Sequence, residues 1–188
     1  GNSMVSTFPK LAQQHSSYVV KQLQAFKDGS RKDPMMSPMA AGLSDEDMRD
    51  IGAYYAAQKI SENALPVLNS DDDDDEPKAA DKDAEKKDDK KDEVLQTKIA
   101  QGSDLYRNGD LVREVSACIA CHGPYGEGNK PAAFPALKSQ HADYLIKSLT
   151  DFKSGARSNN PDNMMHMIAK KMTDDEIKAV AYRISMMK

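Results

Sequence analysis

The 188-residue chain has few of the residues that usually fill a protein core. It has no tryptophan and only four phenylalanines, and 39% of its residues are hydrophobic. That is a thin supply for two cores, unless something else fills part of them. No apolar run approaches the roughly 20 residues of a membrane span, so no membrane-spanning helix is expected.

Cysteine is also scarce, and charge is unevenly spread. The chain has two cysteines, and its formal net charge of −4 gives no reason to expect nucleic-acid binding. Residues 70–93 carry a net charge of −7, so the rest of the chain carries +3, the difference between −4 and −7. Burial cannot offset the ordering entropy of such a segment, which predicts a solvated linker, partly helical at its Lys/Glu-rich end. An acidic docking tail for a basic partner is the alternative.

Two stretches of the chain are copies of one unit. "FPKLAQQHSSYVVKQLQAFKDGSR" at 8–31 and "FPALKSQHADYLIKSLTDFKSGAR" at 134–157 share 12 of 24 residues at a constant offset of 126. This identity indicates an internal duplication, and two copies separated by a linker favour tandem domains over a solenoid. We therefore predict a first half at residues 1–60, an acidic linker at 61–93 and a second half at 94–188.

Helical patterns run through both halves. Residues 15–27 and 141–153 have apolar residues at helical spacing, and each segment ends near a glycine. Capping-box spacings, at Ser44–Asp47 and Thr173–Glu176, predict that a further helix begins in each half. One more helix is predicted over 94–107, and no segment has a convincing strand pattern. The predicted fold class is all-α, and the capped helices are expected to bury Met48, Ile51 and Tyr55 in one copy and Ile177, Val180 and Ile184 in the other.

The sequence CIACH at residues 118–122 has the spacing of a c-type haem attachment site. Cys118 and Cys121 are one helical turn apart, so both thiols project from one face, and His122 follows them directly. Two thioether bonds to haem vinyl groups and one imidazole bond to the iron match this spacing. A thioredoxin-like pair would need a βαβ context, and a zinc site about four ligands, and the sequence offers neither. A structural disulfide stays open but leaves His122 unexplained.

A haem iron in an electron carrier needs a sixth ligand, and a methionine thioether suits electron transfer. The stretch NNPDNMMHMIAKKM supplies the candidates Met164, Met165, Met167 and Met172. Met165 aligns with Met36 of the first copy and is the predicted ligand, with Met167 as the main alternative. His166 would give a bis-histidine haem. His141 heads a predicted helix, which favours a surface or capping role.

The motifs CIACHGPYGEGN and RKDPMMSPMAAGLSDED, together with the duplicated unit, resemble the dihaem, two-domain cytochromes c of the c4 type. The resemblance covers nearly the whole chain except the acidic linker. It implies two tandem class I cytochrome c domains, each with one covalent haem c that has His and Met as iron ligands. On this chain it makes Cys118 and Cys121 the thioether anchors and His122 and Met165 the iron ligands.

The resemblance also assigns roles around the haem. Pro135 would lie where the family's proline carbonyl accepts the ring N–H of the proximal histidine and fixes its tautomer. Tyr144 would help to wall the haem pocket, although plain core packing explains it equally well.

The family's function is electron transfer in the periplasm, by proteins that are soluble or loosely held at the inner membrane. The resemblance implies redox partners such as an upstream quinol-oxidising complex and a terminal oxidase, no small-molecule substrate, and no enzymatic activity. Two alternatives stay open. One is a haem-based sensor or peroxidase-like enzyme whose sixth ligand position opens, and the other is a haem-free binding module with a structural CxxC.

The chain departs from the family pattern at its start. His122 precedes Gly128 by six residues, so if Gly1 matches Gly128 a first CxxCH would end six residues before Gly1. The first half also has no counterpart of the 94–107 helix. We therefore expect a truncated first domain, in preference to a natural single-haem descendant or completion by another chain. Met36 is then the expected ligand of a first haem that this chain cannot attach through cysteine.

Overall fold

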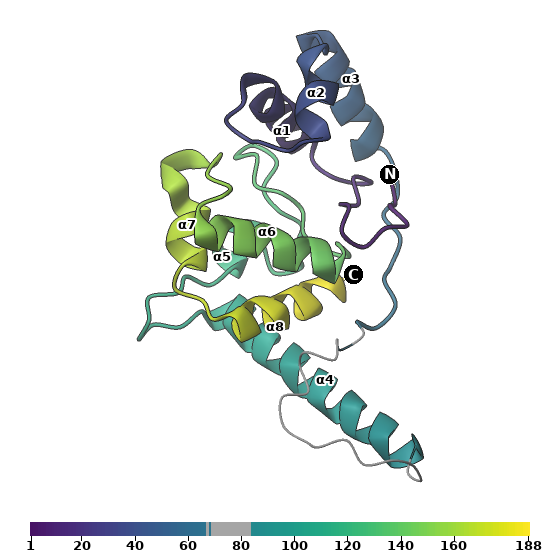
Figure 1. Ribbon diagram of the computed structural model, residues 1–188, viewed down its shortest axis with the longest axis vertical. Helices are drawn as coiled ribbons and strands as arrows, with labels where there is room; N and C mark the ends of the chain where they lie inside the picture. The colour runs from purple at the N-terminus through teal and green to yellow at the C-terminus, as the bar shows by residue number, and fades with distance from the viewer. Residues whose placement is uncertain (67, 69–83) are drawn as a thin grey trace.

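The structure, a computed structural model, is built from helices (Figure 1). It describes residues 1–66, 68 and 84–188, so the acidic run at 71–76 and most of the predicted linker lie outside the described residues. The described ranges contain eight α-helices, one 3-10 turn and no strand, with two isolated β-bridges at Asp110–Val115 and Asn129–Phe134. The all-α prediction is confirmed.

Three helices form the first half: α1 (Ser16–Asp28), α2 (Met36–Ala41) and α3 (Asp45–Ala56). Helix α3 begins with the predicted capping box, in which the Ser44 hydroxyl accepts from the Asp47 amide and the Asp47 carboxylate accepts from the Ser44 amide. The buried core of this half is small and consists of Val19, Leu23 and Met48.

Five helices and a turn form the rest: α4 (Ala84–Asn108), α5 (Ile119–His122), α6 (Ala142–Ser154), η2 (Pro161–Asn163), α7 (Met164–Ala169) and α8 (Asp174–Ser185). Helix α8 begins with the second predicted capping box, which Thr173 and Glu176 form. Ten buried residues from α4, α6, α8 and the loops make one core, among them Tyr106, Leu145 and Ile177.

The helices are arranged in layers (Figure 1), with α1–α3 at one end, α6–α8 in the middle and α4 along the far side. Helices α4 and α8 cross closely at Gly102, where an added Cβ would lie 1.9 Å from the carbonyl oxygen of Ala179. The start of α4 projects beyond the rest of the molecule. Among the described residues no helix has the length and apolar character needed to cross a membrane.

Two local features differ from the sequence-based expectation. Helix α4 begins at Ala84, so the helix predicted over 94–107 continues into the Lys/Glu-rich end of the linker, which was itself expected to be partly helical. Ile51 and Tyr55 are half-buried, not buried. The reason is that no described helix packs along α3 in the way that α4 packs along α8.

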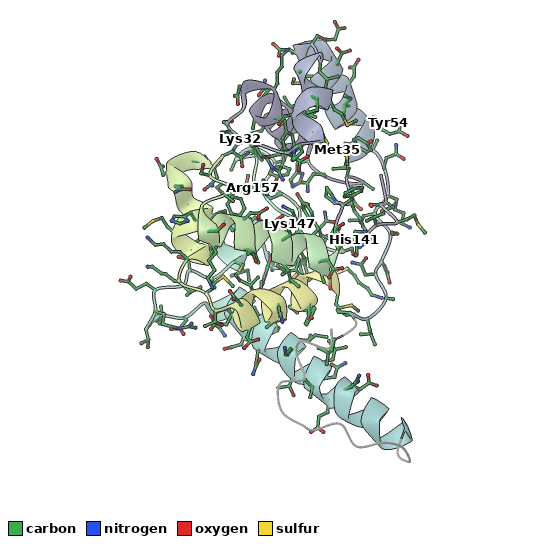
Figure 2. The ribbon with its side chains drawn as sticks, viewed as in Figure 1. Lys32, Met35, Tyr54, His141, Lys147 and Arg157 are labelled. Carbon is green, nitrogen blue, oxygen red and sulfur yellow. The ribbon has the colours of Figure 1, made fainter. Side chains whose placement is uncertain are left out.

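The two halves meet through contacts that repeat the sequence duplication. The guanidinium of Arg157 donates to the Tyr18 hydroxyl at 2.9 Å, and that of Arg31 donates to the Tyr144 hydroxyl at 3.4 Å. Figure 2 places Arg157 at the boundary between the α1–α3 layer and the α6–α7 layer. Because these residues are related by the offset of 126, the contact has approximate two-fold symmetry.

Candidate functional site

The predicted haem-attachment residues lie on one turn of the chain. Cys118 is the N-cap residue directly before α5, and Cys121 and His122 lie within the helix. The amides of Cys121 and His122 donate to the Cys118 carbonyl at 3.2 and 3.0 Å, which holds the three residues in one helical turn. Both thiols are free and half-buried. Burial raises the pKa of Cys118 to about 11, so this group is a thiol at neutral pH.

The His122 ring is buried, with 7% of the residue exposed, and its orientation is fixed. Its Nδ1 lies 3.0 Å from the carbonyl oxygen of Pro135. Because a carbonyl only accepts, Nδ1 carries the proton, and Nε2 keeps its lone pair. Burial lowers the pKa of His122, and the Pro135 contact opposes this shift only in part, so the neutral ring is favoured. A neutral imidazole with Nε2 available is the form that binds iron.

The loop after α5 brings Pro135 to the histidine. The Gly128 amide donates to the His122 carbonyl at 2.8 Å, so the chain turns back directly over α5. Gly128 has a φ of +74°, and an added Cβ would lie 2.6 Å from the Pro135 carbonyl. Only glycine fits this conformation and this close approach without strain. The glycine of the GEGN stretch therefore serves the His122–Pro135 contact.

Met165, the predicted distal ligand, lies in the first turn of α7. Its amide donates to the side-chain oxygen of Asn160 at 2.9 Å, and the residue is half-buried. Met167 is 47% exposed, and Met172 is buried in the core of the second half. His166 Nδ1 lies 2.7 Å from the Phe152 carbonyl. Half-burial therefore favours Met165 over the exposed Met167.

A strained turn precedes this methionine. Asp162 and Asn163 have φ values of 53° and 52°, in the left-handed region that side chains other than glycine rarely adopt. Both lie in the insertion that distinguishes the second copy of the repeat from the first. Two consecutive residues of this kind cost free energy and are usually found where the backbone must be placed for a function. Here they set the entry of α7 and so the position of Met165.

Two other predicted site residues lie away from α5. The Tyr144 hydroxyl contacts Arg31 of the first half, so its polar end faces the contact between halves. Met36 begins α2 and packs against the small core of the first half. Its amide donates to the Asp33 carboxylate, three residues before it, at 2.8 Å, whereas Asn160 holds Met165 from five residues before it.

The donor set fits haem c. Two thiols lie on one turn, a neutral imidazole presents Nε2, and Met165 on α7 is half-buried with its amide held by Asn160. The side-chain nitrogen of Asn160 is buried without a hydrogen-bond partner among the residues that the structure describes, so a donor remains available beside Met165. The sequence reading did not single out Asn160. The sequence feature that could have revealed it is an Asp-Pro or Asn-Pro dipeptide before the methionines, Asp33-Pro34 in the first copy and Asn160-Pro161 in the second.

Comparison with known proteins points to one family. The cytochrome c family model matches residues 99–186. Cytochrome c4 of Azotobacter vinelandii is 38% identical, and the match covers 96% of this chain and 77% of that protein. The thiosulfate dehydrogenase electron acceptor of Stutzerimonas stutzeri is 36% identical over 93% of this chain and 68% of that protein.

A solved structure agrees in fold over the whole chain. The crystal structure of reduced recombinant cytochrome c4 from Pseudomonas stutzeri has a TM-score of 0.81 and 34% identity. The match covers 100% of this chain and 89% of that chain.

Proposed function

This chain belongs to the cytochrome c4 family of haem c electron-transfer proteins, and from that premise we propose that its second half is a one-electron carrier. When bound, haem c supplies an Fe(III)/Fe(II) couple that changes by one electron. Cys118 and Cys121 would hold it by two thioether bonds. His122 Nε2 and the Met165 sulfur would be the protein ligands of the iron.

The observation that carries this proposal is the His122–Pro135 contact. A CxxCH sequence alone is short, but a buried histidine directly after it, with Nδ1 tied to a carbonyl, is arranged to bind a metal through Nε2. A disulfide or a surface turn would need neither the burial nor the tautomer.

The fixed backbone at Met165 supports electron transfer over a sensor or peroxidase-like enzyme. Gas binding or peroxide chemistry needs a sixth position that opens. Met165 is instead half-buried and anchored through its amide to Asn160. Two protein ligands that stay in place keep reorganisation small when the iron changes charge.

The redox partners and the compartment are also proposed, from the resemblance to cytochromes c of the c4 type. We propose that the carrier works in the bacterial periplasm, between an upstream quinol-oxidising complex and a terminal oxidase. Two relatives are named as thiosulfate dehydrogenase electron acceptors, so a dehydrogenase is the alternative electron donor. Met36 is the proposed counterpart of Met165 in the first half, and in each case the methionine amide donates to an Asp or Asn side chain that precedes a proline.

The test is to produce the full chain with a cytochrome c maturation system and measure covalent haem by mass and by the pyridine haemochrome spectrum. We expect one haem per chain, and none in a Cys118→Ala, Cys121→Ala double variant. A chain that folds without covalent haem would contradict the proposal.

The distal ligand is tested with a matched pair of variants. Met165→Ala is expected to abolish the near-infrared Met–Fe(III) band and to lower the midpoint potential, because a ligand that favours Fe(II) is lost. Met167→Ala, an exposed neighbour on the same helix, is expected to keep both. The reverse result would make Met167 the ligand. Rapid binding of cyanide or carbon monoxide to the unmodified protein at neutral pH would favour the sensor or enzyme.

A further inference from the structure

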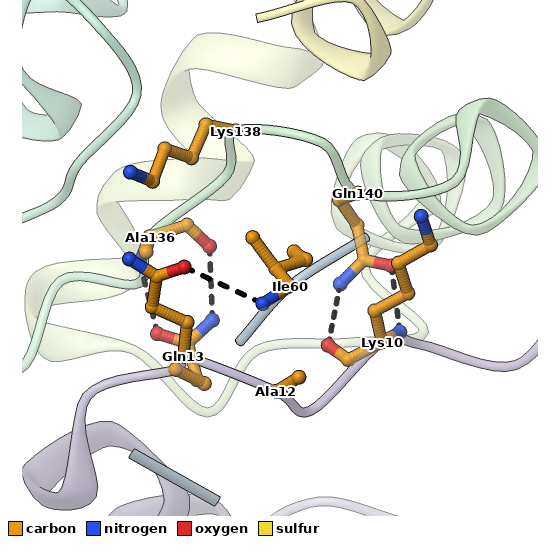
Figure 3. A pocket seen from close by; sticks show the side chains of 8 residues that line it. Lys10, Ala12, Gln13, Ile60, Ala136, Lys138 and Gln140 are labelled. Carbon is orange, nitrogen blue, oxygen red and sulfur yellow. Dashed lines mark hydrogen bonds between the residues drawn. The ribbon is translucent and has the colours of Figure 1, made fainter. Parts of the chain in front are cut away.

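Gln14, in the first half, holds one backbone residue of the second half with both ends of its amide. Its Nε2 donates to the Ala136 carbonyl at 2.9 Å, and its Oε1 accepts from the Ala136 amide at 2.9 Å. The residue is 7% exposed, so both bonds form away from bulk water. Figure 3 shows Ala136 with these two bonds.

The peptide bond that Gln14 engages is the one that orients His122. The Ala136 amide and the Pro135 carbonyl are the two ends of a single planar peptide group. That carbonyl accepts from His122 Nδ1 at 3.0 Å, and that amide donates to Gln14 at 2.9 Å. The three groups therefore form one chain of hydrogen bonds, from the imidazole through the peptide to the amide of Gln14.

We propose that Gln14 is a positioning residue for the proximal histidine, so the first half tunes the reduction potential of the haem in the second half. This inference rests on the proposed haem site at His122. When the Ala136 amide donates to Gln14, the peptide group is polarised, and the Pro135 carbonyl becomes a stronger hydrogen-bond acceptor. A stronger acceptor draws the Nδ1 proton and makes the imidazole a better electron donor, which stabilises Fe(III) over Fe(II).

Two further contacts hold the same loop from the same side. His15 Nε2 lies 2.7 Å from the Glu127 carbonyl, and the Ser17 hydroxyl donates to the Lys130 carbonyl at 2.7 Å. Together with Gln14 they attach the start of α1 to residues 127–136. The loop between the CxxCH motif and Pro135 is thus supported by the first half at three points.

The internal repeat supplies a matched control. Gln140, at the offset of 126, engages Lys10 of the first half in the same way, with bonds of 2.8 and 2.9 Å, and is 5% exposed. The carbonyl of the preceding residue, Pro9, corresponds to that of Pro135. Both cysteines of the chain lie in the second half, so Gln140 engages a peptide with no CxxCH histidine from this chain.

The experiment compares Gln14→Leu with Gln140→Leu in the full-length holoprotein by spectroelectrochemical titration. Both variants lose two hydrogen bonds across the same interface and one from the amide of the next residue, and both keep a side chain of similar size. We expect Gln14→Leu to raise the midpoint potential. The expected shift is about two- to fivefold in the ratio of reduced to oxidised haem. Removal of a group that bonds directly to a metal ligand typically has an effect of about tenfold or more, and Gln14 acts one step further away. At 59 mV per tenfold this is about 20–40 mV, with the near-infrared band retained.

Two results of this comparison would overturn the proposal. The first is an unchanged midpoint potential in Gln14→Leu. The second is an equal shift in Gln140→Leu, which would mean that general loosening of the interface causes the shift. The unmodified holoprotein gives a second measurement that needs no variant to fold. The Ala136 amide proton and the His122 Nδ1 proton belong to one chain of bonds, so both are expected to exchange slowly with solvent. Fast exchange of the Ala136 amide would overturn the proposal on its own.

The outcomes separate this inference from the proposed function. Absence of covalent haem in the unmodified chain would contradict the function. Covalent haem with a potential that Gln14→Leu does not move would contradict the inference alone.

Discussion

At the residue scale, the residues that reveal the site in the sequence differ from the groups that orient its histidine in the structure. The spacing of Cys118, Cys121 and His122 was enough to predict haem attachment, because cysteine and histidine carry distinctive chemistry. The groups that fix His122 are a backbone carbonyl and the amide of Gln14, and neither has a diagnostic residue type. The available signal was that glutamine is identical in both copies of the repeat.

Glu176 provides a pH-dependent test at this scale. Its carboxylate accepts from Arg113 Nη1 at 2.9 Å and from the Thr173 amide at 2.8 Å. Hydrogen bonding to Arg113 is the main cause that holds the pKa of Glu176 below its usual 4.5, and burial opposes it. A lowered pKa means that the ionised carboxylate stabilises the folded state. That stability is complete above pH 4.5 and is lost as the pH falls through the lower, folded-state pKa.

We expect Glu176→Gln to lower the melting temperature at pH 7 by about 1–3 °C, because glutamine keeps the cap but loses the ion pair. The difference from the unmodified protein should shrink below pH 4.5 and vanish in stronger acid. Asp175→Asn, at an exposed position on the same turn, is the control and should change little at either pH. A difference that persists unchanged at pH 3 would rule out the ion pair as its source.

At the scale of elements, helix starts that carry a local capping pattern were predicted, and four of the six residues expected to be buried on the capped helices, Met48, Ile177, Val180 and Ile184, are buried. Capping boxes at Ser44 and Thr173 are local patterns, and both were confirmed. The start of α4 was placed too late, because its first turns are rich in charge and have no apolar face to reveal a helix. Burial of Ile51 was overestimated, since burial depends on a neighbouring helix and not on the periodicity of α3 itself.

The crossing of α4 and α8 can be tested at Gly102. A Cβ there would lie 1.9 Å from the Ala179 carbonyl oxygen, which belongs to backbone and cannot rotate away. We expect Gly102→Ala to lower the free energy of unfolding by about 1–3 kcal/mol, despite the better helix propensity of alanine. Gly42→Ala is the control, because an added Cβ there meets nothing within 4 Å. Urea unfolding of the holoprotein measures both, and equal stabilities would show that the two helices can move apart at no cost.

At the scale of the whole molecule, the duplication is visible in the sequence, but the contact between its copies is not. Twelve identities predicted two related units. They did not reveal that Arg157 of one copy donates to Tyr18 of the other, or that Arg31 and Tyr144 repeat this contact. A residue that is identical in both copies can serve the fold of each copy or the contact between them. The helical spacing of apolar residues does not distinguish these two roles, because residues at the interface also lie at helical spacing.

The two related contacts differ enough to predict unequal effects. Both arginines stack on a phenylalanine ring, at 4.5 Å for Arg157 and 4.6 Å for Arg31, but Arg157 is buried, at 8% exposure. Its bond to Tyr18 is 2.9 Å long, whereas the bond from the half-buried Arg31 to Tyr144 is 3.4 Å. Loss of a partner from a buried cation costs more than loss from one that water can reach.

We therefore expect Tyr18→Phe to lower the free energy of unfolding of the holoprotein by about 1–2 kcal/mol and Tyr144→Phe by about 0.5 kcal/mol or less. Urea titrations followed by helix content and by haem absorbance measure both values. Helix content reports on the whole chain, whereas haem absorbance reports chiefly on the second half. If Tyr18→Phe separates them into two transitions, Arg157 couples the halves. Equal losses for the two variants would show instead that both arginines are similarly solvated, and that the interface is looser around Arg157 than its burial indicates.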